Sequence, residues 1–239
     1  RVFLQGPYEA NNGMMHDDLR TAGLIPLTEP YTNLGYTRIG SDNENTTTDV
    51  LALTGNDAIV DWVLVELRDP ADPATILSNR SALLQRDGGV VDTDGTSPIS
   101  FPVAASHYHV AIRHRNHLGV MTADAIALEA PLRSIDLTTG DLGTYGTHAQ
   151  QEHNGVLLLW SGDVDGNGTI SYSGLGNDRD RILQSIGGSI PTATVQGYIG
   201  VDSNMNGTAK YSGLNNDREI ILQNIGGSVP TAIRAAQLP

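Results

Sequence analysis

Oxygen-bearing side chains recur at every second position of the segment 163–169, which reads Asp-Val-Asp-Gly-Asn-Gly-Thr. Calcium is a hard cation that takes about six to eight oxygen ligands from carboxylates, amides and backbone carbonyls. Asp163, Asp165, Asn167 and the backbone carbonyl of Thr169 supply such oxygens, and a glycine permits the sharp turn between them. The segment is therefore typical of a calcium-binding loop.

This loop occurs twice. The same pattern returns 39 positions later, with Asp202, Asn204, Asn206 and Thr208 at the equivalent places (163 to 202). The residues that follow also match, since Tyr-Ser-Gly-Leu, Asn-Asp-Arg and Ile-Gly-Gly-Ser appear at the same spacing in both copies. An internal repeat this close indicates a duplicated structural unit.

The residue that closes each loop is displaced from its usual place. An EF-hand loop takes a bidentate carboxylate at its twelfth position, but that position is Gly174 here. We predict a loop expanded by about four residues and closed by Asp178, with Asp217 in the second copy. Each of these acids would start a helix, over about 178–186 and 217–225, that ends in Gly-Gly. Alternatively, the loops are ordinary Asn/Asp/Gly turns and the two acids are helix N-caps.

The sequence thus predicts two calcium ions that hold a small domain together. The predicted ligands are Asp163, Asp165, Asn167, Thr169 and Asp178 in the first loop, and Asp202, Asn204, Asn206, Thr208 and Asp217 in the second. The first loop has three candidate carboxylates and the second has two. Because the number of charged ligands tunes affinity, we expect the second site to bind calcium more weakly.

Composition excludes several classes of protein. The 239 residues carry 14 basic and 27 acidic side chains, a formal charge of −13. Nucleic acid is an unsuitable partner because phosphate binding needs a basic surface. No cysteine is present, so disulfides and thiolate metal sites are excluded. No apolar run is long enough to span a bilayer. The start at Arg1 is read as that of a mature chain whose leader has been removed.

The remainder of the chain reads as mainly β. The run 58–68 is long and apolar on both alternating faces, which favours a central strand. Short strand-like segments separated by turn residues favour an antiparallel β-sandwich over residues 1–150, followed by the small calcium-loop and helix pair over 151–239. The other expected strands are 1–5, 49–53, 82–85, 90–91, 99–103, 106–113, 125–128 and 134–137.

Other polar residues were weighed for chemistry. Four histidines, His107, His109, His114 and His117, gather around one strand. No carboxylate stands beside them at ligand spacing, so we expect partly exposed residues at a strand end rather than a metal site. Asp61 and Glu66 lie within the apolar run, where we expect each to pair with Arg68 or a cross-strand partner. No catalytic motif is found, and we predict a protein that is not an enzyme.

Two resemblances add to these predictions. The paired Asp-x-Asp/Asn-x-Asn-Gly loops, with a helix that starts at Asp178-x-x-x-Ile182, resemble a dockerin domain, although the expanded loop is not a dockerin feature. The segments 56–69, 83–88 and 113–121 make the whole chain similar to a haemagglutinin- or adhesin-like module found near the C-termini of Bacteroidetes cell-surface proteins. This resemblance implies an exported protein with a calcium-stabilised end.

We therefore expect a secreted, non-enzymatic structural or adhesion protein of a bacterial cell surface. A homo-oligomer, filament or layer would form if residues 1–5 added to the sheet edge of a neighbouring copy. One alternative is a carbohydrate-binding module for a surface glycan, which would need exposed Trp or Tyr on one face. Another is a dockerin-type domain that docks onto a cohesin-like partner.

Overall fold

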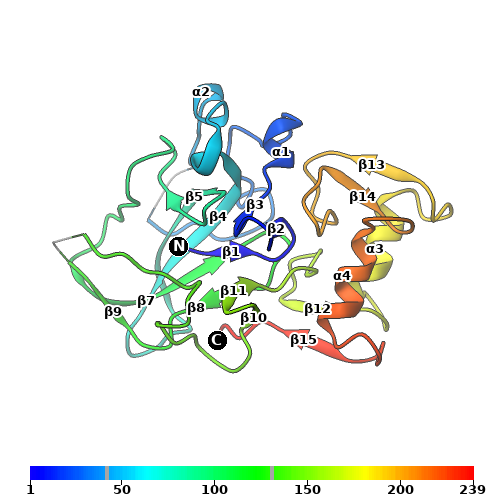
Figure 1. The fold of residues 1–239 in the computed structure, drawn as a ribbon. Coiled ribbons are helices and arrows are strands. Elements are labelled where there is room, and N and C mark those ends of the chain that lie inside the picture. Colours follow the sequence, from blue (N-terminus) through cyan, green and yellow to red (C-terminus); the bar gives the residue numbers. More distant parts are fainter. Residues whose placement is uncertain (41–42, 130–131) are drawn as a thin grey trace.

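The computed structural model describes residues 1–40, 43–129 and 132–239, and its largest element is a six-stranded antiparallel sheet (Figure 1). The strand order is β6-β5-β4-β7-β8, and β9 also pairs with β7. The strands are β4 (Ile59–Arg68), β5 (Ile76–Gln85), β6 (Val90–Val91), β7 (Ser106–Arg113), β8 (Val120–Met121) and β9 (Ile126–Leu128). The prediction that 58–68 forms a central strand is confirmed, because β4 is buried along its whole length between β5 and β7.

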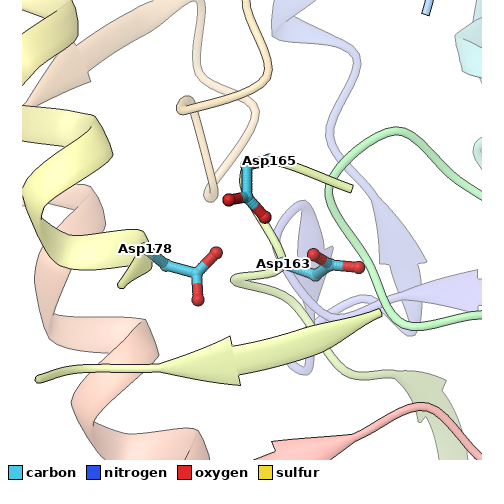
Figure 2. A group of neighbouring side chains, drawn as sticks. All are labelled: Asp163, Asp165 and Asp178. Carbon is cyan, nitrogen blue, oxygen red and sulfur yellow. The ribbon is translucent and has the colours of Figure 1, made fainter. Parts of the chain in front are cut away.

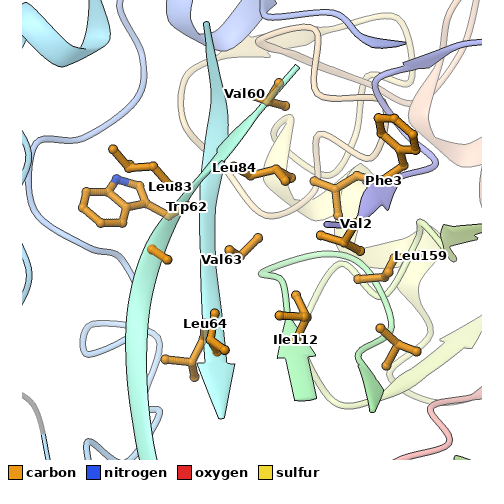
Figure 3. Packing of buried hydrophobic residues seen from close by; sticks show 14 of the residues in the cluster. Val2, Phe3, Val60, Trp62, Val63, Leu64, Leu83, Leu84, Ile112 and Leu159 are labelled. Atoms are coloured by element: carbon orange, nitrogen blue, oxygen red, sulfur yellow. The ribbon is translucent and has the colours of Figure 1, made fainter. Parts of the chain in front are cut away.

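Both faces of β4 pack against other parts of the chain. Trp62 and its cross-strand neighbour Leu83 lie on one face of the sheet (Figure 3). Val63 points to the opposite face, toward Val2 and Leu159, and all five side chains are buried. Alternation of apolar side chains along the strand thus fills two layers at once.

A three-stranded sheet of order β1-β11-β10 covers part of that second face. It consists of β1 (Phe3–Leu4), β10 (Gln150–His153) and β11 (Val156–Leu159). β1 runs parallel to β11, and Val2 and Leu4 have no exposed surface. The N-terminal strand is therefore paired on one side within its own chain, as the edge strand of this sheet. The addition of residues 1–5 to a neighbour's sheet stays a prediction. The rest of the N-terminal region contains the hairpin β2 (Tyr8–Glu9) and β3 (Met14–Met15), and the single turns α1 (Asp18–Thr21), α2 (Thr48–Leu51) and η1 (Gly55–Asp57).

The two repeats form a pair of matched units. The first contains β12 (Thr169–Ser171), α3 (Asp178–Ser185) and β13 (Thr194–Gln196), and the second contains β14 (Thr208–Lys210), α4 (Asp217–Asn224) and β15 (Ile233–Ala235). Each element starts 39 residues after its counterpart (169 and 208, 178 and 217, 194 and 233). Both predicted helices are thus confirmed, and α3 and α4 lie side by side (Figure 1).

These units interlock rather than folding separately. β12 of the first unit pairs with β15 of the second, and β13 of the first pairs with β14 of the second. Matching hydrogen bonds of 2.7 Å run from Ser173 Oγ to the Pro230 carbonyl and from Ser212 Oγ to the Pro191 carbonyl. The shared core contains the equivalent pairs Ile170 and Ala209, Ile182 and Ile221, and Ile186 and Ile225. Because each loop strand finds its partner in the other unit, neither unit completes its own sheet.

A mainly β protein is confirmed, but three expected strands are wrong. Residues 48–51 form the turn α2 because Thr47 caps it by accepting a hydrogen bond from the Val50 N–H. Residues 99–103 and 134–137 run beside the sheet without forming strands. Pro102 cannot donate to a ladder, which explains the first of these. Within the described ranges, every helix is too short or too polar to cross a membrane.

The second unit docks onto the β-sheet region through Asn224, at the end of α4. Its side chain donates to Gln5 Oε1 (2.7 Å) and the Ser161 carbonyl (2.6 Å) and accepts from Gln5 Nε2 (2.9 Å). Asn224 is buried, whereas its equivalent in α3, Ser185, is exposed. The two units are therefore not equivalent at this position, because only the second unit contacts the N-terminal segment there.

Replacement of Asn224 tests this docking. Asn224→Ala should lower the free energy of unfolding by about 1–3 kcal/mol, because buried partners lose their hydrogen bonds. Ser185→Ala changes the same position of the other repeat and should have no measurable effect. Urea unfolding followed by Trp fluorescence measures both, and equal effects of the two substitutions would show that this docking contact is energetically unimportant.

Candidate metal centre

Three carboxylates converge at the first loop (Figure 2). Asp163 and Asp165 come from the loop before β12, and Asp178 comes from the first turn of α3. One oxygen of each lies within 4.8 Å of the others. Gly166 and Gly168 adopt positive φ angles of 71° and 81°, which let the loop turn back on itself. The structure therefore brings together the three acids that the sequence assigned to this loop.

Asp163 has one carboxylate oxygen without a hydrogen bond. It is only 5% exposed, and its Oδ2 accepts a hydrogen bond from the Gly168 N–H at 3.0 Å. Its Oδ1 is buried and has no hydrogen-bond partner. Burial, and then the nearby charge of Asp178, raise the pKa of Asp163 to about 7. A buried carboxylate oxygen without a donor is costly, and a cation would satisfy it.

Asp178 is fixed by the backbone of the loop that it closes. Its Oδ1 accepts from the Val164 N–H (2.9 Å) and its Oδ2 from the Ser171 N–H (2.7 Å). Burial, and then the charge of Asp165, raise its pKa to about 6. The N-cap of α3 is Asn177, whose side chain accepts from the Asp180 N–H. The alternative in which Asp178 is itself the helix cap is therefore wrong.

The two remaining candidates complete the loop. Asn167 Oδ1 accepts from the Thr169 N–H at 2.8 Å, an Asx turn that orders the segment. The ladder bond at the start of β12 is made by the Gly168 carbonyl, which accepts from the Ala236 N–H. Thr169 opposes Ala235 in a pair without ladder bonds, so its carbonyl is left available for another partner.

All candidate donors in this loop are oxygens, which suit a hard cation such as calcium or magnesium and not a soft one. The unsatisfied Asp163 Oδ1 lies in the same cluster as two further carboxylates. These residues therefore fit a divalent cation, and the cluster could hold a metal ion.

The second loop repeats this arrangement with fewer charges. Asp217 accepts from the Ser203 and Lys210 N–H groups, each at 2.7 Å, which correspond to the partners of Asp178. Asp202 Oδ2 accepts from the Gly207 N–H at 2.8 Å, and its Oδ1 also has a donor, the Asn206 N–H at 3.2 Å. Burial, and then the charge of Asp202, raise the pKa of Asp217 to about 7.

The remaining predicted ligands of the second loop hold its backbone. Asn204 donates from Nδ2 to the Asn215 carbonyl at 3.0 Å. Asn206 accepts from the Thr208 N–H at 2.9 Å, as Asn167 does in the first loop. The amide of Asn204 therefore stands where the first loop has the carboxylate of Asp165.

Sequence reasoning missed the groups that hold the second loop from outside. Asn116 Nδ2 donates to the carbonyls of Gly200 (3.0 Å) and Asp202 (2.7 Å). Ser161 Oγ donates to the Ser203 carbonyl at 2.6 Å. These side chains lie far from the loop in sequence, and no local pattern marks them. They leave the second loop buried against the β-sheet region, whereas Asp165 and Asn167 of the first loop are exposed.

Three of the four histidines, His109, His114 and His117, are buried rather than partly exposed as predicted, whereas His107 is exposed. His117 Nε2 accepts from the Gly6 N–H (3.1 Å), so its Nδ1 carries the proton and faces His114 Nδ1 at 3.0 Å. His114 Nε2 then donates to Asp61 Oδ2 at 3.1 Å. A carboxylate does therefore lie beside these imidazoles, contrary to the sequence argument. It arrives from β4, more than 50 residues away (114 and 61).

Of the two buried acids of β4, Glu66 pairs with Arg68 as expected, whereas Asp61 pairs with Arg115 from the segment after β7. Asp61 Oδ2 lies 2.9 Å from Arg115 Nε, and Glu66 Oε2 lies 2.7 Å from Arg68 Nη2. Burial acts to raise the pKa of Asp61, but the Arg115 guanidinium and the His114 hydrogen bond outweigh it and hold the pKa at about 2. Asp61 is thus a structural anion.

The indoles do not provide a sugar-stacking platform. Trp62 is fully buried, and the Trp160 ring is covered by the Arg234 guanidinium at 3.6 Å from its centroid. The aromatic face expected of a carbohydrate-binding module is therefore not supplied by either tryptophan.

No family description, curated protein or solved structure matches this chain. The similarities to dockerins and to the cell-surface module remain hypotheses from the sequence.

Buried carboxylates predict an unusual pH dependence for the calcium-free protein. Because the pKa values of Asp163 and Asp178 are raised to about 7 and about 6, their stabilising protonated forms are lost as the pH rises through these values. In EDTA at about pH 7.5, Asp163→Asn should be more stable than wild type by about 2 kcal/mol, a difference that shrinks toward about pH 5.

Urea midpoints of the two proteins across this range measure the difference. Burial also lowers the pKa values of His114 and His117, so these two residues destabilise the fold as the pH falls. Because both proteins contain them, the difference in stability between the two proteins reports on Asp163 alone. A wild type that is more stable than Asp163→Asn in EDTA at about pH 7.5 would contradict the repulsion described for the loop.

Proposed function

We propose that the paired loops bind calcium and that the protein is a calcium-stabilised, non-enzymatic structural or adhesion protein of a bacterial cell surface. The observation that carries the proposal is the buried, unpartnered Asp163 Oδ1 within 4.8 Å of two further carboxylates. An ion there would offset both the burial and the repulsion by Asp178 that raise the pKa of Asp163. It would also tie the loop before β12 to the start of α3.

Calcium suits these loops better than magnesium. Magnesium demands a near-ideal octahedral shell and keeps several waters, whereas calcium accepts irregular shells of carboxylate, amide and carbonyl oxygens. The first loop offers this mixture from Asp163, Asn167 and Thr169. Loop sites of this kind are filled at the millimolar calcium levels found outside cells, which favours a secreted protein. The formal charge of −13 also favours solubility in such a setting.

A stabilising role is favoured over a signalling one. The two helices pack against each other, and their apolar residues are buried in one shared core. Calcium sensors instead open a helix pair to expose an apolar groove. The interlocked strands β12–β15 and β13–β14 oppose such opening. We further propose that the β region is a sandwich and that the repeats form a dockerin-like pair, so docking onto a partner protein is the second candidate function.

Chelation tests the proposal directly. At free calcium about 100-fold above the dissociation constant, each bound ion should add about 2.7 kcal/mol to the free energy of unfolding. EDTA should therefore lower the melting temperature and expose the region after residue 160 to protease. In calcium, Asp163→Asn should be less stable than wild type, the reverse of its effect in EDTA. The half-exposed neighbour Asp180 supplies the control, because Asp180→Asn should bind calcium normally. A melting temperature that is the same with and without EDTA would refute the proposal.

The second site should be the weaker one. Both oxygens of Asp202 already accept hydrogen bonds, and Asn204 replaces the third carboxylate. In calorimetric titration we expect two binding events, with Asp178→Asn removing the tighter and Asp217→Asn the weaker. If Asp217→Asn instead removed the tighter event, the ranking by carboxylate number would be wrong.

A further inference from the structure

An open cavity of about 510 Å³ with a mixed polar and apolar lining lies beside the second loop. Its walls come from that loop, from the start of α4 and from the N-terminal segment. Five amide side chains dominate the lining: Asn204, Asn206, Asn215, Asn216 and Gln223. Its size falls in the range of small-molecule sites, about 300–1,000 Å³.

The chemistry of the lining selects a class of ligand. Amide groups both donate and accept hydrogen bonds, as hydroxyl groups do. Asp18 and Glu219 also line the cavity, and no Lys or Arg does so among the described residues, which disfavours an anion. Leu214 and Ile220 supply an apolar side for C–H groups. These features together suit a neutral sugar, which carries hydroxyls at its edge and C–H groups on its faces.

The two repeats differ at the positions that form this cavity. Asn204 and Ile220 replace Asp165 and Arg181 of the first unit (39 residues apart in each case), whose side chains pair at 3.4 Å. The second unit therefore has an amide and an apolar side chain where the first has a charged pair. This exchange makes the second unit, and not the first, suited to an uncharged ligand.

Backbone conformation adds to this contrast. Asn215 replaces Gly176, and both have positive φ, 56° and 72°. Glycine adopts this conformation at lower cost than asparagine does. The amide that it brings lines the cavity.

The N-terminal segment forms one side of the cavity. His16 Nε2 lies 3.1 Å from the Asn204 carbonyl, and His16 Nδ1 is buried without a hydrogen-bond partner. Gly6 lines the same wall, and a methyl group on it would lie 2.2 Å from the Ser203 carbonyl oxygen. The close approach of the chain here shapes the cavity around the second loop.

We propose that this cavity binds a neutral glycan and that its binding depends on calcium. Asn204 and Asn206 belong both to the cavity lining and to the second calcium loop, so an ion that orders the loop also sets the cavity. The inference rests on the proposed calcium site. It would make the second loop a recognition element and the first a purely structural one.

A glycan microarray of neutral and acidic oligosaccharides tests this, probed with the full chain in excess calcium and in excess EDTA. Neutral glycans should be retained in calcium and released in EDTA. Gln223→Ala, which leaves every predicted calcium ligand in place, should weaken affinity for a retained glycan about tenfold, as expected for a lost hydrogen bond of about 1.4 kcal/mol. Gln184→Ala alters the same position of α3 and should leave affinity unchanged.

Calorimetric calcium titration of the same samples separates the two proposals. Two bound calcium ions without any retained neutral glycan would overturn the glycan proposal and leave the calcium proposal standing. Absence of calcium binding would refute both. Preference for acidic glycans, binding that persists in EDTA, or equal losses in Gln223→Ala and Gln184→Ala would each overturn the glycan site.

Discussion

Burial of like charges is the constraint on which the C-terminal half of the structure depends. Asp163 and Asp178 are held together in one loop, and Asp202 and Asp217 in the other, with raised pKa values. Each pair is fixed by backbone N–H donors, so neither carboxylate can turn away. Protons or cations that offset this repulsion therefore stabilise the fold at neutral pH.

The exchange of strands explains how two such small units fold at all. A unit of about 39 residues is near the size at which an apolar core alone is too small without a metal or another staple. Here each loop strand pairs with the tail strand of the other unit, and their apolar residues merge in one core. Ordering one loop therefore also stabilises the other. The hydrogen bonds of Asn224 to Gln5 and Ser161 connect this pair of units to the β-sheet region.

Local patterns predicted the parts of this structure whose determinants are close in sequence. The loop acids, the helices at Asp178 and Asp217 and the buried strand β4 follow from spacing, capping and alternation. Residues 49–53 were misassigned because a single threonine, Thr47, decided between strand and helical turn. The parallel pairing of β1 with β11 was out of reach, because it joins residues more than 150 positions apart.

The candidate site shows the same division. The convergence of Asp163, Asp165 and Asp178 could be predicted from the repeat, whereas the anchors of the second loop could not. Asn116 reaches Asp202 across the interface, and His114 meets Asp61 between two strands. Such contacts depend on tertiary packing and leave no periodic signal in the chain. The exchange of Asp165 and Arg181 for Asn204 and Ile220 can be read from the sequence, but only the structure shows that Asn204 and Ile220 line a cavity.

A crystal structure of the protein grown in calcium tests the central claim most directly. The account predicts one ion in each loop, with about six to eight oxygen ligands at roughly 2.3–2.6 Å. Asp163 Oδ1, Asp178 and the Thr169 carbonyl should be among the ligands of the first ion. Loops that keep the same conformation in calcium, with water or a shared proton between Asp163 and Asp178 and no ion, would contradict the account.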